Sequence, residues 1–199
     1  PGEYWYASGF PPSVWHNGTS IALLPFAVLL FHYSARFLDS PRVMELLPIA
    51  LLVTLNLLIK PSLFLCFAPV FPLYVLLRHG PGRAFLLSCL PVLLGCAIMG
   101  AQYLVIYHSA EYDRIAEAGG ASLALGWFHP WKLWAGNIPL VIFNAVLVPL
   151  LFIAGYPRVL RSETRVGYAL ALLIMAVLIY AFVYETGDRE LHGNFGWQT

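Results

Sequence analysis

The chain has 199 residues, of which 60% are hydrophobic and 11% charged, with a formal net charge of +1. Soluble domains carry about 25% charged residues, so this composition excludes an ordinary water-soluble domain. The near-neutral charge gives no reason to expect a nucleic acid as partner.

Largely apolar stretches follow one another along the chain, separated by short charged loops. About 20 apolar residues in helical conformation cross the hydrocarbon core of a bilayer. In chain order the predicted spans are Thr19–Phe37, Arg42–Ile59, Ser62–Leu77, Ala84–Tyr107, Ile138–Gly155 and Val166–Tyr184. We therefore expect an all-α fold, a polytopic transmembrane bundle of about six spans with outward-facing loops, with residues 1–199 forming a single transmembrane domain.

Two details of the chain modify this expectation. The third span is short and contains Pro69 and Pro72, so we expect its helix to be kinked or broken. The chain begins at Pro1 without a methionine or a charged leader, and it stops at Thr199 inside a polar, aromatic segment. We therefore expect a fragment of a longer protein.

Arginines gather on one side of the predicted topology. That side would hold Arg36, Arg42, Arg78, Arg83, Arg158, Arg161 and Arg165. The other side would hold Lys60, Arg114, Lys132 and Arg189, together with most of the acidic residues. Loops rich in arginine and lysine face the cytoplasm, so the arginine-rich side is predicted to be cytoplasmic. Both chain ends and the long loop at residues 108–137 then face outward.

Lys60 follows the second predicted span and precedes Pro61, which starts the third. A lysine at a helix end often reaches to the lipid headgroups, an explanation that needs no ligand. The functional alternative is that the proline-started helix holds Lys60 near the outer leaflet, where its ammonium would bind a lipid-linked phosphate. Asn56, one helical turn earlier, would line the same cavity.

Two further outward segments carry candidate cavity residues. Trp15, His16 and Asn17 precede the first span, where they could equally form an interfacial anchor and a helix cap. The tail carries His192, Asn194 and Trp197 among acids and glycines. Mixed charge usually marks a solvated loop, whereas glycines between rings suit a backbone that a ligand approaches closely. The functional hypothesis places these residues around one outward cavity, with Lys60 close to His192.

The long outward loop holds further titratable side chains. They are His108, Glu111, Asp113, Arg114, His129 and Lys132. The two histidines lack the close spacing of a zinc-binding helix, so no metal ligand is assigned and a divalent metal is left open as a cofactor. Aromatic rings in this loop could instead stack on a sugar face or a prenyl chain.

Few polar residues interrupt the spans. His32, Asn56, Gln102 and Asn144 are predicted to make hydrogen bonds between helices. A central Asp or Glu is missing from the predicted spans, which disfavours an ion-coupled transporter.

Three segments together carry a family resemblance: WHNGTSIALLPFAVLLF, NLLIKPSLFLCFAPVFPLY with the basic turn after it, and RELHGNFGW. They resemble bacterial multi-spanning membrane glycosyltransferases of the GT-C class. The lysine-proline pair at a helix end, before a proline-rich span, is the most telling piece. The resemblance covers most of the chain.

The resemblance implies inverting transfer of a sugar from a polyprenyl-phosphate-linked donor to an acceptor on the outer membrane face. It implies a multi-pass protein of the bacterial inner membrane, acting in the cell envelope, with membrane lipid and the lipid-linked donor as partners. Lys60 would hold the donor phosphate, and His16, Asn17, His192 and Asn194 would line the cavity. Enzymes of this class use acids in a first outward loop, which would lie upstream of Pro1. The catalytic residues therefore stay unassigned.

Other classes fit the same pattern. A carrier or flippase for a lipid-linked glycan would also have kinked spans and aromatic outward loops. An envelope polysaccharide polymerase or ligase would share the donor and the location, and a non-catalytic membrane subunit is a further alternative. An enzyme needs an acid beside Lys60, whereas a carrier needs access from both faces.

Overall fold

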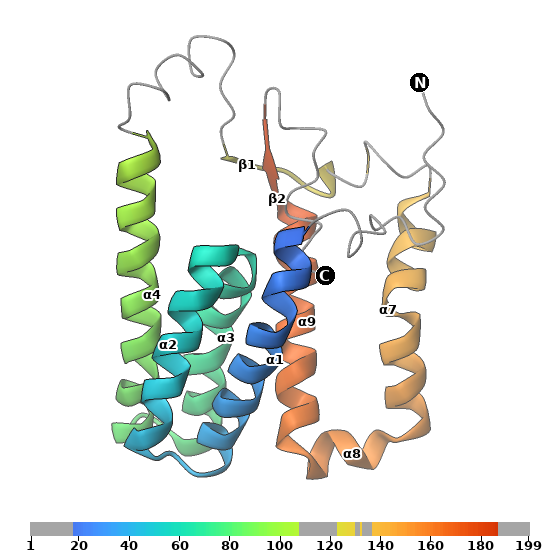
Figure 1. Ribbon diagram of the computed structural model, residues 1–199. Helices are drawn as coiled ribbons and strands as arrows, with labels where there is room; N and C mark the ends of the chain where they lie inside the picture. The colour runs from blue at the N-terminus through green and yellow to red at the C-terminus, as the bar shows by residue number, and fades with distance from the viewer. Residues whose placement is uncertain (1–17, 108–122, 130–131, 133–136, 187–199) are drawn as a thin grey trace.

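The computed structural model describes residues 18–107, 123–129, 132 and 137–186. These residues form helices and two short strands (Figure 1). The helices are α1 (Gly18–Asp39), α2 (Val43–Ile59), α3 (Ser62–His79), α4 (Arg83–Tyr107), α7 (Ile138–Gly155), α8 (Pro157–Ser162) and α9 (Thr164–Phe182). The strands are β1 (Leu123–Leu125) and β2 (Val183–Glu185), which pair antiparallel. Each predicted span coincides with a helix.

By length and composition, α1, α3, α4 and α9 are four helices able to cross a membrane. The described part of the chain is thus a mostly helical protein with the character of a membrane protein. The 17-residue α2 and the Val146–Gly155 part of α7 are shorter apolar helices. The count of six spans therefore stays a prediction.

The helices α1, α2, α3, α4 and α9 run side by side in a bundle (Figure 1). Within it α2 packs against α1 and α4, while α3 packs against α4 and α9. In contrast, α7 stands at the far side of the molecule, and α8 connects it to α9. The bundle is the part of the described chain in which buried side chains concentrate.

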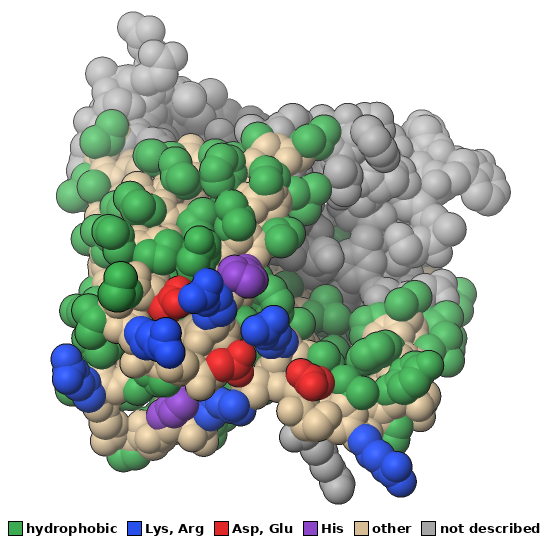
Figure 2. All heavy atoms as spheres, turned by 60° about the horizontal axis from the view of Figure 1, so that its bottom comes forward, with side chains coloured by type: hydrophobic (Ala, Val, Ile, Leu, Met, Phe, Trp, Pro, Cys, Tyr) green, Lys and Arg blue, Asp and Glu red, His purple; other side chains and the backbone are tan. Residues whose placement is uncertain are grey.

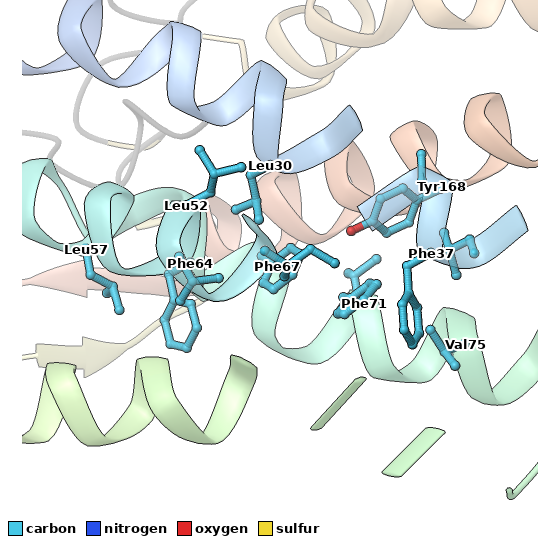
Figure 3. Close-up of a cluster of buried hydrophobic side chains, with 14 residues drawn as sticks. Leu30, Phe37, Leu52, Leu57, Phe64, Phe67, Phe71, Val75 and Tyr168 are labelled. Atoms are coloured by element: carbon cyan, nitrogen blue, oxygen red, sulfur yellow. The ribbon is translucent and has the colours of Figure 1, made fainter. Parts of the chain in front are cut away.

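The core of the bundle follows one face of α3 (Figure 3). Phe64, Phe67, Phe71 and Val75 recur at three- and four-residue spacing, so their side chains share this face. The rings of Phe67 and Phe71 stack at 4.9 Å between centroids. Phe71 also meets Phe37 of α1 at 5.7 Å. Since lipid is as apolar as these side chains, close packing rather than escape from water holds such helices together.

A second set of contacts ties α9 to the same core. Tyr168 is buried and its ring stacks on Phe31 of α1 at 5.5 Å. It also lies 5.5 Å from the ring of Tyr74 on α3, and the Tyr74 hydroxyl donates a hydrogen bond to the carbonyl of Thr164 at 3.5 Å. The aromatic rings therefore join three helices that are distant in sequence.

Two expectations about helix continuity are corrected. The helix α3 is continuous through Pro69 and Pro72, so the span is not broken there, and the alternative of a kink stays a prediction. Each proline removes one N–H, and the rest of the helical ladder, braced by the neighbours of α3, holds the segment together. The last span also ends earlier than expected, because α9 stops at Phe182 and Val183–Glu185 forms a strand. The fold is therefore not purely α-helical.

The arginine-rich connections lie together at one end of the molecule, which we call the basic end. Figure 1 places the α1–α2 turn, the α3–α4 turn and α8 at this end. The α2–α3 turn and the β1–β2 pair lie at the opposite end (Figure 1). The grouping of the arginines on one side is thus confirmed for the described residues. Its assignment to the cytoplasm stays a prediction.

Candidate functional site

Two of the predicted cavity residues, Lys60 and Asn56, fall within the described part of the chain. The other candidates lie outside the described residues: Trp15, His16, Asn17, His192, Asn194 and Trp197. The expected proximity of Lys60 and His192 therefore stays a prediction. In the long loop, His129 and Lys132 are described, whereas His108, Glu111, Asp113 and Arg114 are not.

The local sequence explains why the chain turns at Lys60. A proline disfavours helical geometry at the residue before it, and Lys60, which ends α2, has the extended values φ −163° and ψ 122°. Its backbone N–H still donates to the carbonyl of Asn56 at 2.7 Å. Pro61 then takes φ −70° and ψ −8° and leads directly into α3. The turn between α2 and α3 thus consists of Lys60 and Pro61 alone.

The unequal lengths of the helices set the depth of this turn. At 1.5 Å per residue, α2 rises about 25 Å from the basic end and α4 about 37 Å. Figure 1 shows α4 extending well beyond the α2–α3 turn. The hydrocarbon core of a bilayer is about 30 Å thick, so a lysine at the end of α2 would lie at the edge of that core. Lys60 is therefore recessed relative to the end of α4.

Burial has an electrostatic consequence for this lysine. Lys60 is half-buried, and loss of hydration lowers the pKa of its ammonium group from the ordinary value of 10.5. Burial thus raises the free energy of the protonated, charged form of Lys60 relative to the neutral amine. An anion bound at the turn would offset that disadvantage, since an opposite charge nearby favours the charged form.

Polar groups of α2 and α4 meet just below Lys60. The side chain of Asn56 is fully buried, and its Nδ2 donates to the carbonyl of Leu52 at 2.7 Å. Among the described residues, the Oδ1 atom of Asn56 has no hydrogen-bond partner. From α4, Gln102 donates its Nε2 hydrogen to the carbonyl of Leu57 at 3.3 Å. The interhelical hydrogen bond predicted for Gln102 is confirmed, whereas the described bond of Asn56 stays within its own helix.

An aromatic group that sequence reasoning missed lies at the same end of the molecule. The N–H of Gly126 donates to the carbonyl of Phe182 at 2.9 Å, and that of Phe128 to the carbonyl of Ala181 at 2.7 Å. These bonds extend the β1–β2 pair and fasten the long loop to the end of α9. The ring of His129 stacks on Tyr184 at 4.0 Å. Three-residue strands carry too little alternation to be recognised in a sequence.

Two residues of this group stand out. Phe128 has a φ of +52°, in the left-handed region that aromatic residues rarely enter. The ring of Trp127, which is exposed, meets the ring of Phe182 edge-on at 4.8 Å. Exposed Trp at the end of an apolar helix is typical of the bilayer interface.

Metal binding finds no support in the described residues, which contain no group of three His, Cys, Asp or Glu side chains able to hold an ion. Of the further polar residues predicted in the spans, His32 is exposed and lies edge-on to Tyr33. Asn144 belongs to α7, and its side chain lies outside what the structure describes.

No protein-family model matches the chain, and no curated protein or solved structure is detectably similar to it.

Proposed function

We propose that the chain is a membrane glycosyltransferase that moves a sugar from a polyprenyl-phosphate-linked donor to an acceptor on the outer face of the bacterial inner membrane. The observation that carries the proposal is the position of Lys60, half-buried at a recessed turn between two apolar helices. A prenyl-linked phosphate keeps its tail in hydrocarbon and its phosphate at the interface. This match in depth between the lysine and such a phosphate supports the proposal.

The role of Lys60 in this proposal is electrostatic. The acceptor hydroxyl attacks the anomeric carbon of the sugar, and the bond from that carbon to the phosphate oxygen breaks. The hydroxyl proton goes to a base, and the prenyl phosphate leaves with an added negative charge. An ammonium group held beside the phosphate stabilises that charge as it develops. In the resembled family the base comes from acids in an outward loop, so we assign none among the described residues.

The basic end argues for access from the outer side only. There the side chains of Phe37, Leu38 and Val75 are buried, and ion pairs join α1 to α2, α3 and α9. A carrier needs a route through both ends of the bundle. Closure of one end by packing and charge pairs therefore favours an enzyme that works from the opposite end.

Binding of a polyprenyl phosphate to the chain in lipid nanodiscs tests the proposal. Lys60→Gln should weaken binding tenfold or more, whereas Lys60→Arg should retain part of it, since Arg keeps the charge but not the compact shape of the ammonium group. Lys132→Gln is the matched control, because Lys132 is the other lysine of the chain and is exposed. Equal binding by wild type and Lys60→Gln would overturn the role of Lys60.

Transfer itself needs a second measurement. Because the catalytic acids are expected upstream of Pro1, the transfer assay uses membranes that contain the native protein carrying this chain. With a polyprenyl-phosphate hexose present, these membranes should release polyprenyl phosphate only when an acceptor is added. Movement of the intact donor across a sealed vesicle without bond cleavage would instead support the carrier.

A further inference from the structure

The basic end carries more positive than negative charge on a single face. Figure 2 shows basic, acidic and histidine side chains gathered there, bordered by hydrophobic side chains. The charged residues with described side chains are Arg36, Arg42, Arg78, Arg83, Arg158 and Arg165, with Asp39, Glu45 and Glu163 as the acids. Their arrangement divides the arginines into two sets.

The first set is committed to pairs within the protein. Arg36 contacts the carboxylate of Glu45 at 2.9 Å. The carboxylate of Asp39 forms ion pairs with Arg165 at 3.5 Å and with Arg78 at 3.9 Å. Arg78 also donates from Nε to the carbonyl of Leu38 at 3.0 Å. These arginines join helices to one another, so they are explained by the fold.

The second set consists of Arg42, Arg83 and Arg158. All three are exposed, and within the described residues none makes an ion pair or a side-chain hydrogen bond. They come from three separate segments, namely the turn before α2, the first residue of α4, and α8. Within the described residues these three arginines therefore have no contact that would explain them as parts of the fold.

Each of these arginines has an exposed apolar neighbour in sequence. Met44, two residues after Arg42, is 86% exposed, and Leu86, three residues after Arg83, is 66% exposed. Tyr156, two residues before Arg158, is 62% exposed. A charged head beside an apolar side chain is the arrangement that suits a bilayer surface, where one enters hydrocarbon and the other meets headgroups.

We propose that Arg42, Arg83 and Arg158 form a docking surface for the headgroups of acidic phospholipids in the leaflet at the basic end. The guanidinium group is planar and presents a fork of N–H donors that matches phosphate oxygens. The apolar neighbours mark the level at which the helices enter the hydrocarbon core, so the three arginines lie at the membrane surface, within reach of lipid headgroups. This position favours a lipid over a nucleic acid or a soluble acidic protein. This proposal does not rest on the proposed enzymatic function.

The test compares lipid retention by the 199-residue chain in nanodiscs that contain phosphatidylglycerol and phosphatidylcholine of equal chain length. Native mass spectrometry counts the lipid molecules that stay bound to the chain after it is released from the nanodisc. The wild-type chain should retain phosphatidylglycerol preferentially. Each arginine near an anionic surface contributes about fivefold in affinity, so the triple variant Arg42→Gln, Arg83→Gln, Arg158→Gln should lose on the order of a hundredfold.

Two controls keep the result interpretable. A second triple variant with lysine at all three positions keeps the charge, so it should retain most of the preference and show that the loss is electrostatic. Lys132→Gln removes one charge at the opposite end and should change nothing. A thermal unfolding curve for each variant verifies that it is folded.

The remaining outcomes overturn the proposal. These are equal retention by wild type and the triple glutamine variant, equal loss in the glutamine and lysine triples, and no lipid preference in the wild type. Displacement of phosphatidylglycerol by inorganic phosphate or by an oligonucleotide would assign the surface to soluble anions instead. Higher salt should weaken the preference, since exposed charges are screened beyond about 8 Å at physiological ionic strength.

Discussion

Gly95 of α4 lies directly against the ring of Phe64 on α3. A Cβ atom added at residue 95 would overlap two ring carbons of Phe64 and would come within 3.0 Å of Val53 on α2. Three helices thus approach one another at Gly95, where α4 has no side chain. Small residues allow such approach, and in lipid the dispersion contacts they permit are a main source of helix association.

Gly95→Ala should therefore destabilise the bundle. Overpacking a well-filled core costs about 1–3 kcal/mol, because the Phe64 ring has to move. The matched control is Gly100→Ala on the same helix, where nothing lies within 4 Å of the added Cβ. That variant should be neutral or more stable by up to about 1 kcal/mol, since Ala favours the helix. Unfolding in detergent measures both, and equal stability of the two variants would contradict the packing described for Gly95.

The two acids of the basic end should differ in their contribution to stability. The side chain of Glu45 is 11% exposed and that of its partner Arg36 is 48% exposed, so Glu45→Gln should cost about 1–2 kcal/mol. Asp39 and its partners are more exposed, and Asp39→Asn should cost less than about 1 kcal/mol. Unfolding in detergent measures the free energy of unfolding of both variants. A larger loss from Asp39→Asn would mean that the network around Asp39 acts cooperatively.

Asn56 offers a way to separate structure from ligand binding. Its Oδ1 atom has no partner among the described residues, and its Nδ2 bonds a carbonyl of its own helix. Asn56→Leu should therefore leave the free energy of unfolding within about 1 kcal/mol of wild type. If Asn56 lines the donor cavity, the same variant should bind polyprenyl phosphate more weakly. A strong loss of stability would show instead that Asn56 has a structural partner.

Lys60 should differ from the other lysine of the chain in its reaction with an acylating reagent. Only the neutral amine reacts, and burial lowers the pKa of Lys60, so its labelling should rise at a lower pH in the folded chain than in the denatured chain. Because the chain has only Lys60 and Lys132, peptide mass spectrometry follows both in one sample. Saturating polyprenyl phosphate should move the Lys60 profile to higher pH. No movement on adding that ligand would count against phosphate binding there.

The same shift has a stability consequence with a definite sign. Between its lowered pKa and the ordinary value of 10.5, Lys60 is less protonated in the folded than in the unfolded state. The unfolded state then binds more protons, so the free energy of unfolding rises as pH rises through that window. Below the window the folded protein carries the full cost of a charged, half-buried ammonium group. Lys60→Met should flatten this slope, as measured by unfolding at a series of pH values.

The helices could be predicted from sequence because the thickness of the bilayer and the need to pair backbone hydrogen-bonding groups within it leave few alternatives to a helix of that length. An apolar run bounded by Lys60-Pro61 or by the Gly80–Arg83 turn has to begin and end close to where it does. The strands could not be predicted. Val183 and Tyr184 continue the apolar run of α9, but they leave the helix and pair with β1, which comes from a distant loop.

The candidate site was predictable in part. Lys60 is expected from the sequence at a helix end, as the structure has it, whereas its half-burial depends on the packing of the neighbouring helices. The pairing of Asp39 with both Arg78 and Arg165 was not predictable, because it depends on which helices are neighbours. The aromatic stack of His129 on Tyr184 depends in the same way on the strand pair. Sequence patterns describe single helices well and their order in space poorly.

The pairing of β1 with β2 closes residues 123–185 into a loop whose two ends are fastened to each other. Within that loop the main described contacts of α7 are with α8, so among the described elements α7 is joined to the bundle chiefly through α8 at the basic end.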